Sequence, residues 1–222
     1  MTITLLSELM VPIIGIGLSP IPIIAVILVL GTADAKRTGP AFALGWLGGL
    51  SALVALLYVL EDLIHVGESA DADYASWVRV ALGIVLLVLA GKKWLKRPKA
   101  GQTPDLPSWM AKIDETTPKK SFVLGAMLGG VNPKNIAFSI VAVTSIMYAT
   151  YGGSMGWMPA VLFVVLCSLA ILIAVLFYLL ATTTATTVLA RIKTFMVKNN
   201  NLIMMCLYIV FGVMLIKKGL GW

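Results

Sequence analysis

Long apolar stretches dominate this chain and constrain its fold more than any other feature of the sequence. A hydrocarbon core about 30 Å thick is crossed by roughly 20 apolar residues of helix. Six stretches approach that length, at residues 9–30, 40–60, 77–95, 122–148, 158–181 and 201–216. Strands of a membrane barrel are short and alternate in polarity, so unbroken apolar runs favour helices. We therefore expect an all-α integral membrane protein with six transmembrane helices.

Charged residues are too scarce to cover a soluble protein of this size. They make up 12% of the 222 residues, and apolar residues make up 59%, whereas a soluble domain is about 25% charged. In a soluble protein the net charge of +7 would suggest a nucleic-acid partner. Here the basic residues lie between apolar stretches, as the positive-inside rule describes. We therefore expect neither a nucleic-acid partner nor a separate soluble domain.

The charges of the connections predict the orientation of the chain. The connections after the first, third and fifth stretches are basic, whereas the second is acidic and the fourth carries no charge. Because basic connections stay in the cytoplasm, both termini are expected outside. Lys217 and Lys218 near the C-terminus disagree with this assignment, and their side chains would have to reach the outer interface.

Three parts make up the expected organisation. Residues 1–95 and 121–222 are two three-helix halves, and residues 96–120 are a cytoplasmic loop rich in Pro and Lys. A short amphipathic helix within this loop, with Trp109 and Asp114, is expected to lie on the inner membrane surface. The alternative is a plain linker with an anchoring tryptophan.

The two halves resemble each other around their first apolar stretch. The run GLSPIPIIAVILVL at residues 17–30 aligns with GVNPKNIAFSIVAV at residues 130–143, so that Ser19 matches Asn132 and Pro20 matches Pro133. Three helices in each half would give the two copies opposite orientations. Inverted repeats with interrupted helices are a recurrent transporter plan, in which the substrate site lies at the interruptions. We therefore expect two inverted three-helix repeats with interrupted helices 1 and 4. Chance similarity between apolar runs is the alternative.

Prolines near the middle of the first and fourth stretches predict these interruptions. Pro20, Pro22 and Pro133 each lack a backbone N–H and clash with the preceding turn. The carbonyl groups that they free, around Ile16 and Leu18 and near Gly129, need new partners inside a membrane.

Lys134 lies about halfway along the fourth stretch, between Asn132 and Asn135. A charge at that depth costs several kcal/mol, so its partners are expected to be freed carbonyls, nearby polar side chains or an anionic substrate. A lysine that only holds the turn of a re-entrant segment is the alternative. The expected substrate path consists of Ser19, Pro20, Pro22, Asn132, Pro133, Lys134 and Asn135. Its expected cytoplasmic mouth is formed by Asp34, Lys36 and Arg37, for which a topology-setting charged turn is the alternative.

Small residues on two stretches indicate close helix packing. Gly45 and Gly49 lie one turn apart, and so do Gly125 and Gly129. Such faces let helix backbones approach each other in a membrane. We interpret them as packing surfaces and not as a site.

The chain lacks the residue patterns of catalysis. It has no G-x-x-x-x-G-K-[ST] motif for ATP, and its one histidine, His65, lies in an acidic connection. Cys167 and Cys206 lie inside apolar stretches, where a thiol acts as a small hydrophobe. We therefore expect no enzymatic activity, no metal site and no cofactor.

Three segments of the sequence resemble a known family. They are GLSPIPIIAVILVL with the downstream KRTGPAFALGWLGG, the loop WMAKIDETTP, and GGVNPKNIAFS. Together they resemble the GAP family of the lysine-exporter superfamily, small actinobacterial proteins named for addressing glycopeptidolipids and sulfolipids to the cell surface. The resemblance implies six helices in two inverted triplets, in the inner membrane of an actinobacterium, and a role in moving envelope lipids. It points to Pro20, Pro22 and the run from Asn132 to Asn135 as the core of the path.

The leading hypothesis from the sequence is an exporter or flippase for an anionic or glycosylated lipid of the cell envelope. An exporter of small solutes, like the amino-acid exporters of the superfamily, is one alternative. A non-transporting accessory subunit of a lipid synthesis or export complex is another. The expected partners are membrane lipids and the lipid substrate, and a homodimer or a larger export complex is left open.

Overall fold

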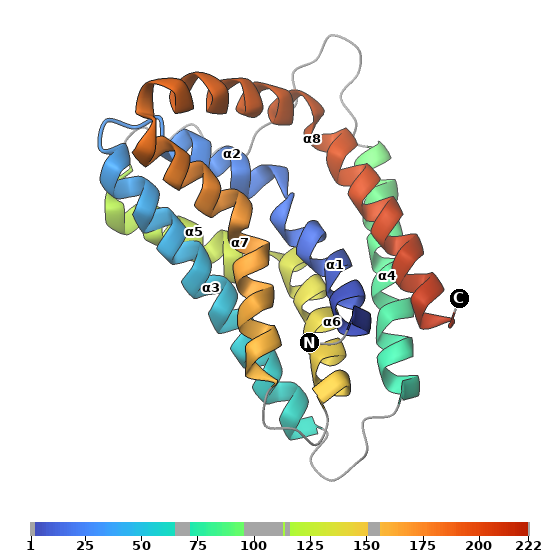
Figure 1. Cartoon of the computed structure of the whole chain (residues 1–222). Helices are drawn as coiled ribbons and strands as arrows, with labels where there is room; N and C mark the ends of the chain where they lie inside the picture. Colours follow the sequence, from blue (N-terminus) through green and yellow to red (C-terminus); the bar gives the residue numbers. More distant parts are fainter. Residues whose placement is uncertain (1–2, 65–71, 96–112, 114–115, 151–155, 222) are drawn as a thin grey trace.

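The computed structural model describes residues 3–64, 72–95, 113, 116–150 and 156–221 (Figure 1). Within these ranges the regular structure is helical and no strand occurs, as the sequence predicts. The helices are α1 (Ile3–Gly17), α2 (Pro20–Val29), α3 (Ala35–Ile64), α4 (Ala72–Leu95), α5 (Pro118–Gly130), α6 (Pro133–Thr150), α7 (Trp157–Leu180) and α8 (Thr182–Gly219). Trp109, Asp114 and the predicted amphipathic helix lie outside the described residues.

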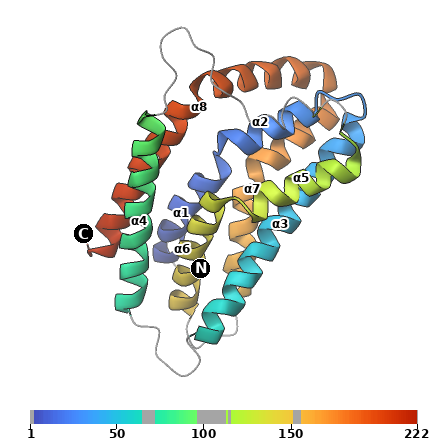
Figure 2. The ribbon, with the colours of Figure 1, turned by 180° about the vertical axis from the view of Figure 1, so that it is seen from behind.

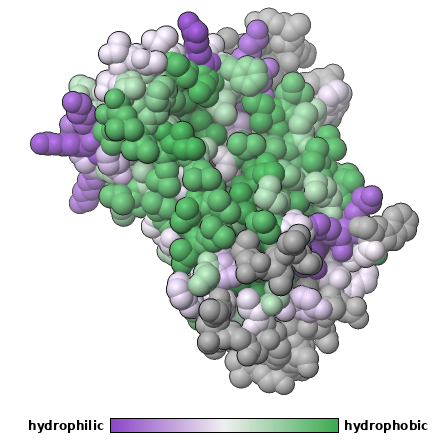
Figure 3. Space-filling view, viewed as in Figure 1, coloured by the Kyte–Doolittle hydropathy of each residue, from purple (hydrophilic) through white to green (hydrophobic). Residues whose placement is uncertain are grey.

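Three of these helices, α3, α7 and α8, are each long and apolar enough to cross a membrane. The pair α1–α2 is bent by 48° and makes a fourth candidate if it forms one span. A broad apolar surface accompanies these helices, with hydrophilic side chains gathered at its margins (Figure 3). The architecture is thus that of an all-helical membrane protein with three to four candidate spans, and six crossings in an inverted repeat stay a prediction.

Both predicted interruptions occur at the predicted prolines. Helix α1 ends at Gly17, and α2 begins at Pro20 with Ser19 as the residue before it. Helix α5 ends at Gly130, and α6 begins at Pro133. Proline suits the first position of a helix, because the N–H that it lacks has no intrahelical partner there. The two breaks therefore restart their helices in the same way.

Glycines bring α3 and α5 into backbone contact, which confirms the packing interpretation of their small-residue faces. A Cβ atom at Gly49 would lie 2.2 Å from the carbonyl oxygen of Ala126, and one at Gly125 would lie 2.2 Å from that of Phe42. Gly45 and Gly129 are also too close for a side chain, with carbonyl oxygens at 2.0 and 2.7 Å from the added atom. No side chain fits between the two helices at these positions. Figure 2 shows α5 running alongside α3.

The connection expected between the fifth and sixth apolar stretches is not a loop. Helix α8 runs without interruption through its 38 residues and includes that connection. No Pro or Gly occurs between Thr182 and Phe211, so nothing in the segment ends a helix. The drop in hydropathy around Arg191 and Lys198 marks a change of environment and not a helix end. Figures 1 and 2 show the first part of α8 crossing one end of the bundle near α2, and the last part lying beside α4.

Polar contacts join helices that are far apart in the sequence. The Arg79 guanidinium on α4 donates to Glu8 Oε2 on α1 at 3.0 Å and to Ser145 Oγ on α6 at 3.1 Å. Near the end of α8, Lys218 Nζ donates to the Ser7 carbonyl oxygen at 3.0 Å. The start of α1 therefore lies beside the end of α8, and the side of the membrane on which they lie stays a prediction.

The neighbouring glycines of α3 offer a matched test of the backbone contact. We expect Gly49→Ala to lower the melting temperature in detergent, because the new methyl group meets a backbone carbonyl that cannot rotate away. Overpacking of this kind costs about 1–3 kcal/mol, or roughly 2–10 °C for a chain of this size. Gly48→Ala is the control, since nothing lies within 4 Å of its Cβ position. It should leave stability unchanged or raise it through helix propensity. Equal effects of the two variants would contradict the packing account.

Candidate functional site

The ammonium group of Lys134 lies where the end of α1 meets the start of α6. The side chain is 4% exposed, and its Nζ donates a hydrogen bond to the carbonyl oxygen of Gly15. The ring of Phe138, one turn further along α6, has its centroid 5.9 Å from Nζ. A buried ammonium group is thus held by a neutral carbonyl and an aromatic face.

The Gly15 carbonyl is available because of the proline at the break. In a continuous helix the carbonyl of Ile16 would accept from the N–H of residue 20, but Pro20 has none. The Ser19 N–H bonds to Ile16 O instead, at 3.3 Å. Gly15 consequently loses its ordinary donor, and Lys134 replaces it. The prediction that freed carbonyls are partners of Lys134 is correct, although the carbonyl is that of Gly15.

Asn135 has the same role at the second break. Its Nδ2 donates to Leu128 O and to Gly129 O, each at 3.0 Å. These carbonyls lie at the end of α5, and Gly129 would otherwise need the N–H that Pro133 lacks. Asn132 Oδ1 accepts from the Lys134 N–H at 3.1 Å and so caps the start of α6. The asparagines that flank Lys134 therefore satisfy the backbone around it.

Two polar atoms next to this site have no hydrogen-bond partner within the described part of the chain. They are Asn135 Oδ1 and Ser139 Oγ, both buried, and they belong to residues one turn apart on α6. A buried acceptor or hydroxyl without a partner costs about 1–3 kcal/mol. Such groups require an explanation, and a bound polar molecule or water would supply the missing bonds.

The other residues of the predicted path are not all brought together. Ser19, Pro20 and Pro22 are buried on the side of α2, whereas Asn132 is half-buried and Pro133 is exposed. The predicted cytoplasmic mouth, Asp34, Lys36 and Arg37, is exposed at the opposite end of α2. The ten residues of α2 separate it from the break by about 15 Å.

The sequence did not single out Gly15 and Phe138. A Cβ at Gly15 would lie 2.5 Å from carbon atoms of the Phe138 ring, and one at Gly17 would lie 3.3 Å from the Cys167 carbonyl oxygen of α7. Phe138 follows Lys134 by four residues, so the two side chains lie on the same side of α6. This spacing is the one sequence signal that could have identified Phe138. Nothing in the sequence alone indicated Gly15.

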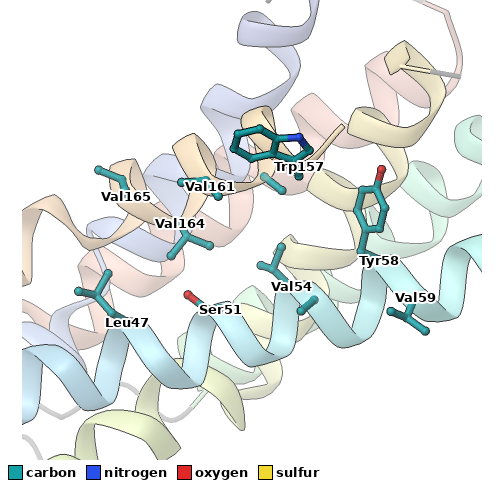
Figure 4. A pocket seen from close by; sticks show the side chains of 11 residues that line it. Leu47, Ser51, Val54, Tyr58, Val59, Trp157, Val161, Val164 and Val165 are labelled. Atoms are coloured by element: carbon teal, nitrogen blue, oxygen red, sulfur yellow. The ribbon is translucent and has the colours of Figure 1, made fainter. Parts of the chain in front are cut away.

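An apolar groove between α3 and α7 is a second feature that the sequence did not indicate (Figure 4). Its volume is about 620 Å³. Tyr58 and Trp157 lie towards one end of it, and Ser51 places a hydroxyl group along its floor. The remaining lining is aliphatic: Leu47, Val54, Ala55, Val59, Ala160, Val161, Val164 and Val165. A groove of this composition fits a hydrocarbon chain better than a polar solute.

Comparison with known protein families gives a match over nearly the whole chain. A sequence profile described as "Sap, sulfolipid-1-addressing protein" matches residues 9–221. No curated protein and no solved structure gives a significant match. The matched region contains both helix breaks, Lys134 and the groove between α3 and α7. On this evidence the chain belongs to the Sap, or sulfolipid-1-addressing, protein family, as its resemblance to the GAP family implies.

Proposed function

We propose that this protein is a transporter or flippase that moves an anionic lipid of the cell envelope across the membrane. The observation that carries the proposal is the buried ammonium group of Lys134 at the junction of two broken helices. The family to which the chain belongs is described by the addressing of a sulfolipid, and an anionic headgroup on the transported lipid is part of our proposal.

The surroundings of Lys134 favour an anionic ligand. A buried cation is normally paired with an acidic group, yet Lys134 forms no ion pair with any described residue. The partners of Lys134 are a carbonyl oxygen and an aromatic ring. A sulfate or phosphate group would supply the missing charge, and charge-assisted hydrogen bonds are about twice as strong as neutral ones.

The groove between α3 and α7 supports a lipid as the transported molecule. The two helices are long and apolar enough to cross a membrane, so an open apolar groove between them faces hydrocarbon. We propose that an acyl chain occupies it. The Tyr58 and Trp157 end carries the aromatic residues typical of a membrane interface, and the lipid headgroup would lie at that end when it is not bound at Lys134.

We further propose the six-crossing arrangement in two inverted halves, in the inner membrane of an actinobacterium, without catalytic chemistry. The matching restarts of α2 at Pro20 and α6 at Pro133 support the repeat. An accessory subunit remains the alternative to a transporter. Purified protein that translocates a fluorescent anionic lipid in liposomes without any partner would decide for the transporter. Activity that requires a co-purifying protein would decide for the accessory role.

The Lys134→Gln variant distinguishes a lysine that binds the substrate from one that only supports the helix break. Glutamine retains an N–H donor for the Gly15 carbonyl but removes the charge. We expect the translocation rate of a fluorescent anionic lipid in liposomes to fall about ten- to a hundredfold, the equivalent of one charged hydrogen bond of about 1.5–3 kcal/mol. The melting temperature should hold or rise, because a buried charge without a counter-ion is costly.

Lys218→Gln is the matched control, since Lys218 also donates to a backbone carbonyl but from an exposed position. It should leave the translocation rate unchanged. The opposite pattern for Lys134→Gln, with lower stability and full activity, would show that the lysine only holds the break together.

The acyl-chain groove is tested by filling it. Val161 and Ile173 are both exposed on α7, at 55% and 61%, but only Val161 lines the groove. We expect Val161→Trp to reduce, severalfold, the labelling of α3 and α7 by a phospholipid that carries a photoreactive acyl chain. Ile173→Trp introduces the same side chain elsewhere on the helix and should not reduce the labelling. Equal labelling of both variants would contradict the proposal that an acyl chain occupies the groove.

A further inference from the structure

Helix α8 is longer than a bilayer requires. Its 38 residues extend about 57 Å at 1.5 Å per residue, whereas a hydrocarbon core is about 30 Å thick. The part beside α4 carries the apolar stretch from residue 201 onwards, and Arg191, Lys193 and Lys198 all lie before it. Residues 182–199, which we call the transverse segment, are therefore the part outside the hydrocarbon. Figure 1 shows this segment crossing one end of the bundle.

The transverse segment has two apolar faces. Ala185 and Leu189 are 0% and 5% exposed and pack into the core of the bundle. Val188, Ile192 and Phe195 form a second stripe at helical spacing, and they are 36%, 38% and 62% exposed. The first stripe explains why the segment docks on the bundle. The second has no partner within the described residues.

A basic face lies beside the exposed apolar stripe. Thr187, Arg191, Thr194 and Lys198 follow one another at intervals of three or four residues, so they share one side of the helix. They line a shallow depression of about 730 Å³ together with Phe195. Within the part of the chain that the structure describes, neither Arg191 nor Lys198 forms an ion pair. The face thus offers two cations without an acidic partner among the described residues, and hydroxyl groups, beside exposed hydrophobic side chains.

We propose that the transverse segment is a binding site for the headgroups of anionic membrane lipids, with Arg191 and Lys198 on the phosphate and Val188, Ile192 and Phe195 in the acyl boundary. A helix with basic and apolar faces side by side is the kind that lies in a membrane interface. Basic side chains at that level attract anionic lipids. A soluble anion would need the two cations alone, and it would leave the apolar stripe in water. This site is independent of Lys134 and of transport.

The experiment is a lipid titration of the detergent-solubilised full chain, followed by native mass spectrometry. Phosphatidylglycerol is the anionic probe, and phosphatidylcholine is the zwitterionic one. We expect the wild-type chain to prefer phosphatidylglycerol. Arg191→Gln with Lys198→Gln should weaken its binding about 25-fold at low salt, or about fivefold for each charge. Raising the salt concentration should weaken the wild-type interaction, since exposed charges are screened.

Matched variants separate this face from general surface charge. Lys119→Gln with Lys120→Gln removes two exposed charges at the start of α5 and should keep the affinity within about twofold. Arg191→Lys with Lys198→Arg conserves the charge and should keep it too, which tests the proposal even if the glutamine variant is unstable. Ile192→Ser with Phe195→Ser should weaken binding without any change in charge.

Four results would overturn the proposal. One is equal affinity for the two lipids, and another is unchanged affinity in the glutamine variant of Arg191 and Lys198. A third is loss of affinity in the charge-conserving variant. The last is complete displacement of phosphatidylglycerol by millimolar inorganic phosphate, which would make the face a site for a soluble anion. The results with the Arg191 and Lys198 variants concern α8 alone, so they can overturn this proposal while the proposed function of Lys134 stands.

Discussion

The carbonyl groups released at two helix breaks are the constraint on which the centre of this protein depends. A membrane interior has no water to satisfy them, so the chain must provide donors. Lys134 bonds the carbonyl that the first break releases at Gly15, and Asn135 bonds those of the second break at Leu128 and Gly129. Two consecutive residues at the start of α6 therefore satisfy both breaks.

This arrangement couples the two breaks to the charge between them. An anion that reached the Lys134 ammonium group would compete with the Gly15 carbonyl, and that carbonyl would then need another donor. The buried Ser139 hydroxyl has no partner among the described residues, so the same helix carries one unused donor, whereas the unpaired Asn135 Oδ1 can only accept. A site of this kind is held together by bonds that a ligand can exchange, unlike a core made only of apolar contacts.

The sequence predicted the features that follow from the covalent structure of single residues. Pro20 and Pro133 begin their helices as expected, because a missing N–H acts locally. Gly49 and Gly125 pack as expected, because only glycine permits that backbone approach.

The sequence predicted a freed carbonyl as the partner of Lys134 but did not identify Gly15. The identity of this carbonyl depends on the Ser19 N–H, which bonds to Ile16 instead of Gly15. The continuity of α8 was missed, because hydropathy reports the surroundings of a helix and not its end. Trp109 and Asp114 lie outside the described residues, and the number of crossings stays a prediction.

Side-chain size on α3 explains why one of its faces is closed and another open. Gly45 and Gly49 face α5, and the two backbones come so close that no Cβ fits between them. Val54 and Tyr58 belong to the side that faces α7, where they line a groove with Val161 and Trp157. β-branched and aromatic side chains hold helix axes apart, and their stiff rotamers cannot collapse to fill the space. The space for an acyl chain therefore arises on the face of α3 where Val54 and Tyr58 hold α7 away and small residues such as Ser51 and Ala55 leave room between the helices. The glycine face packs α3 against α5 on the other side.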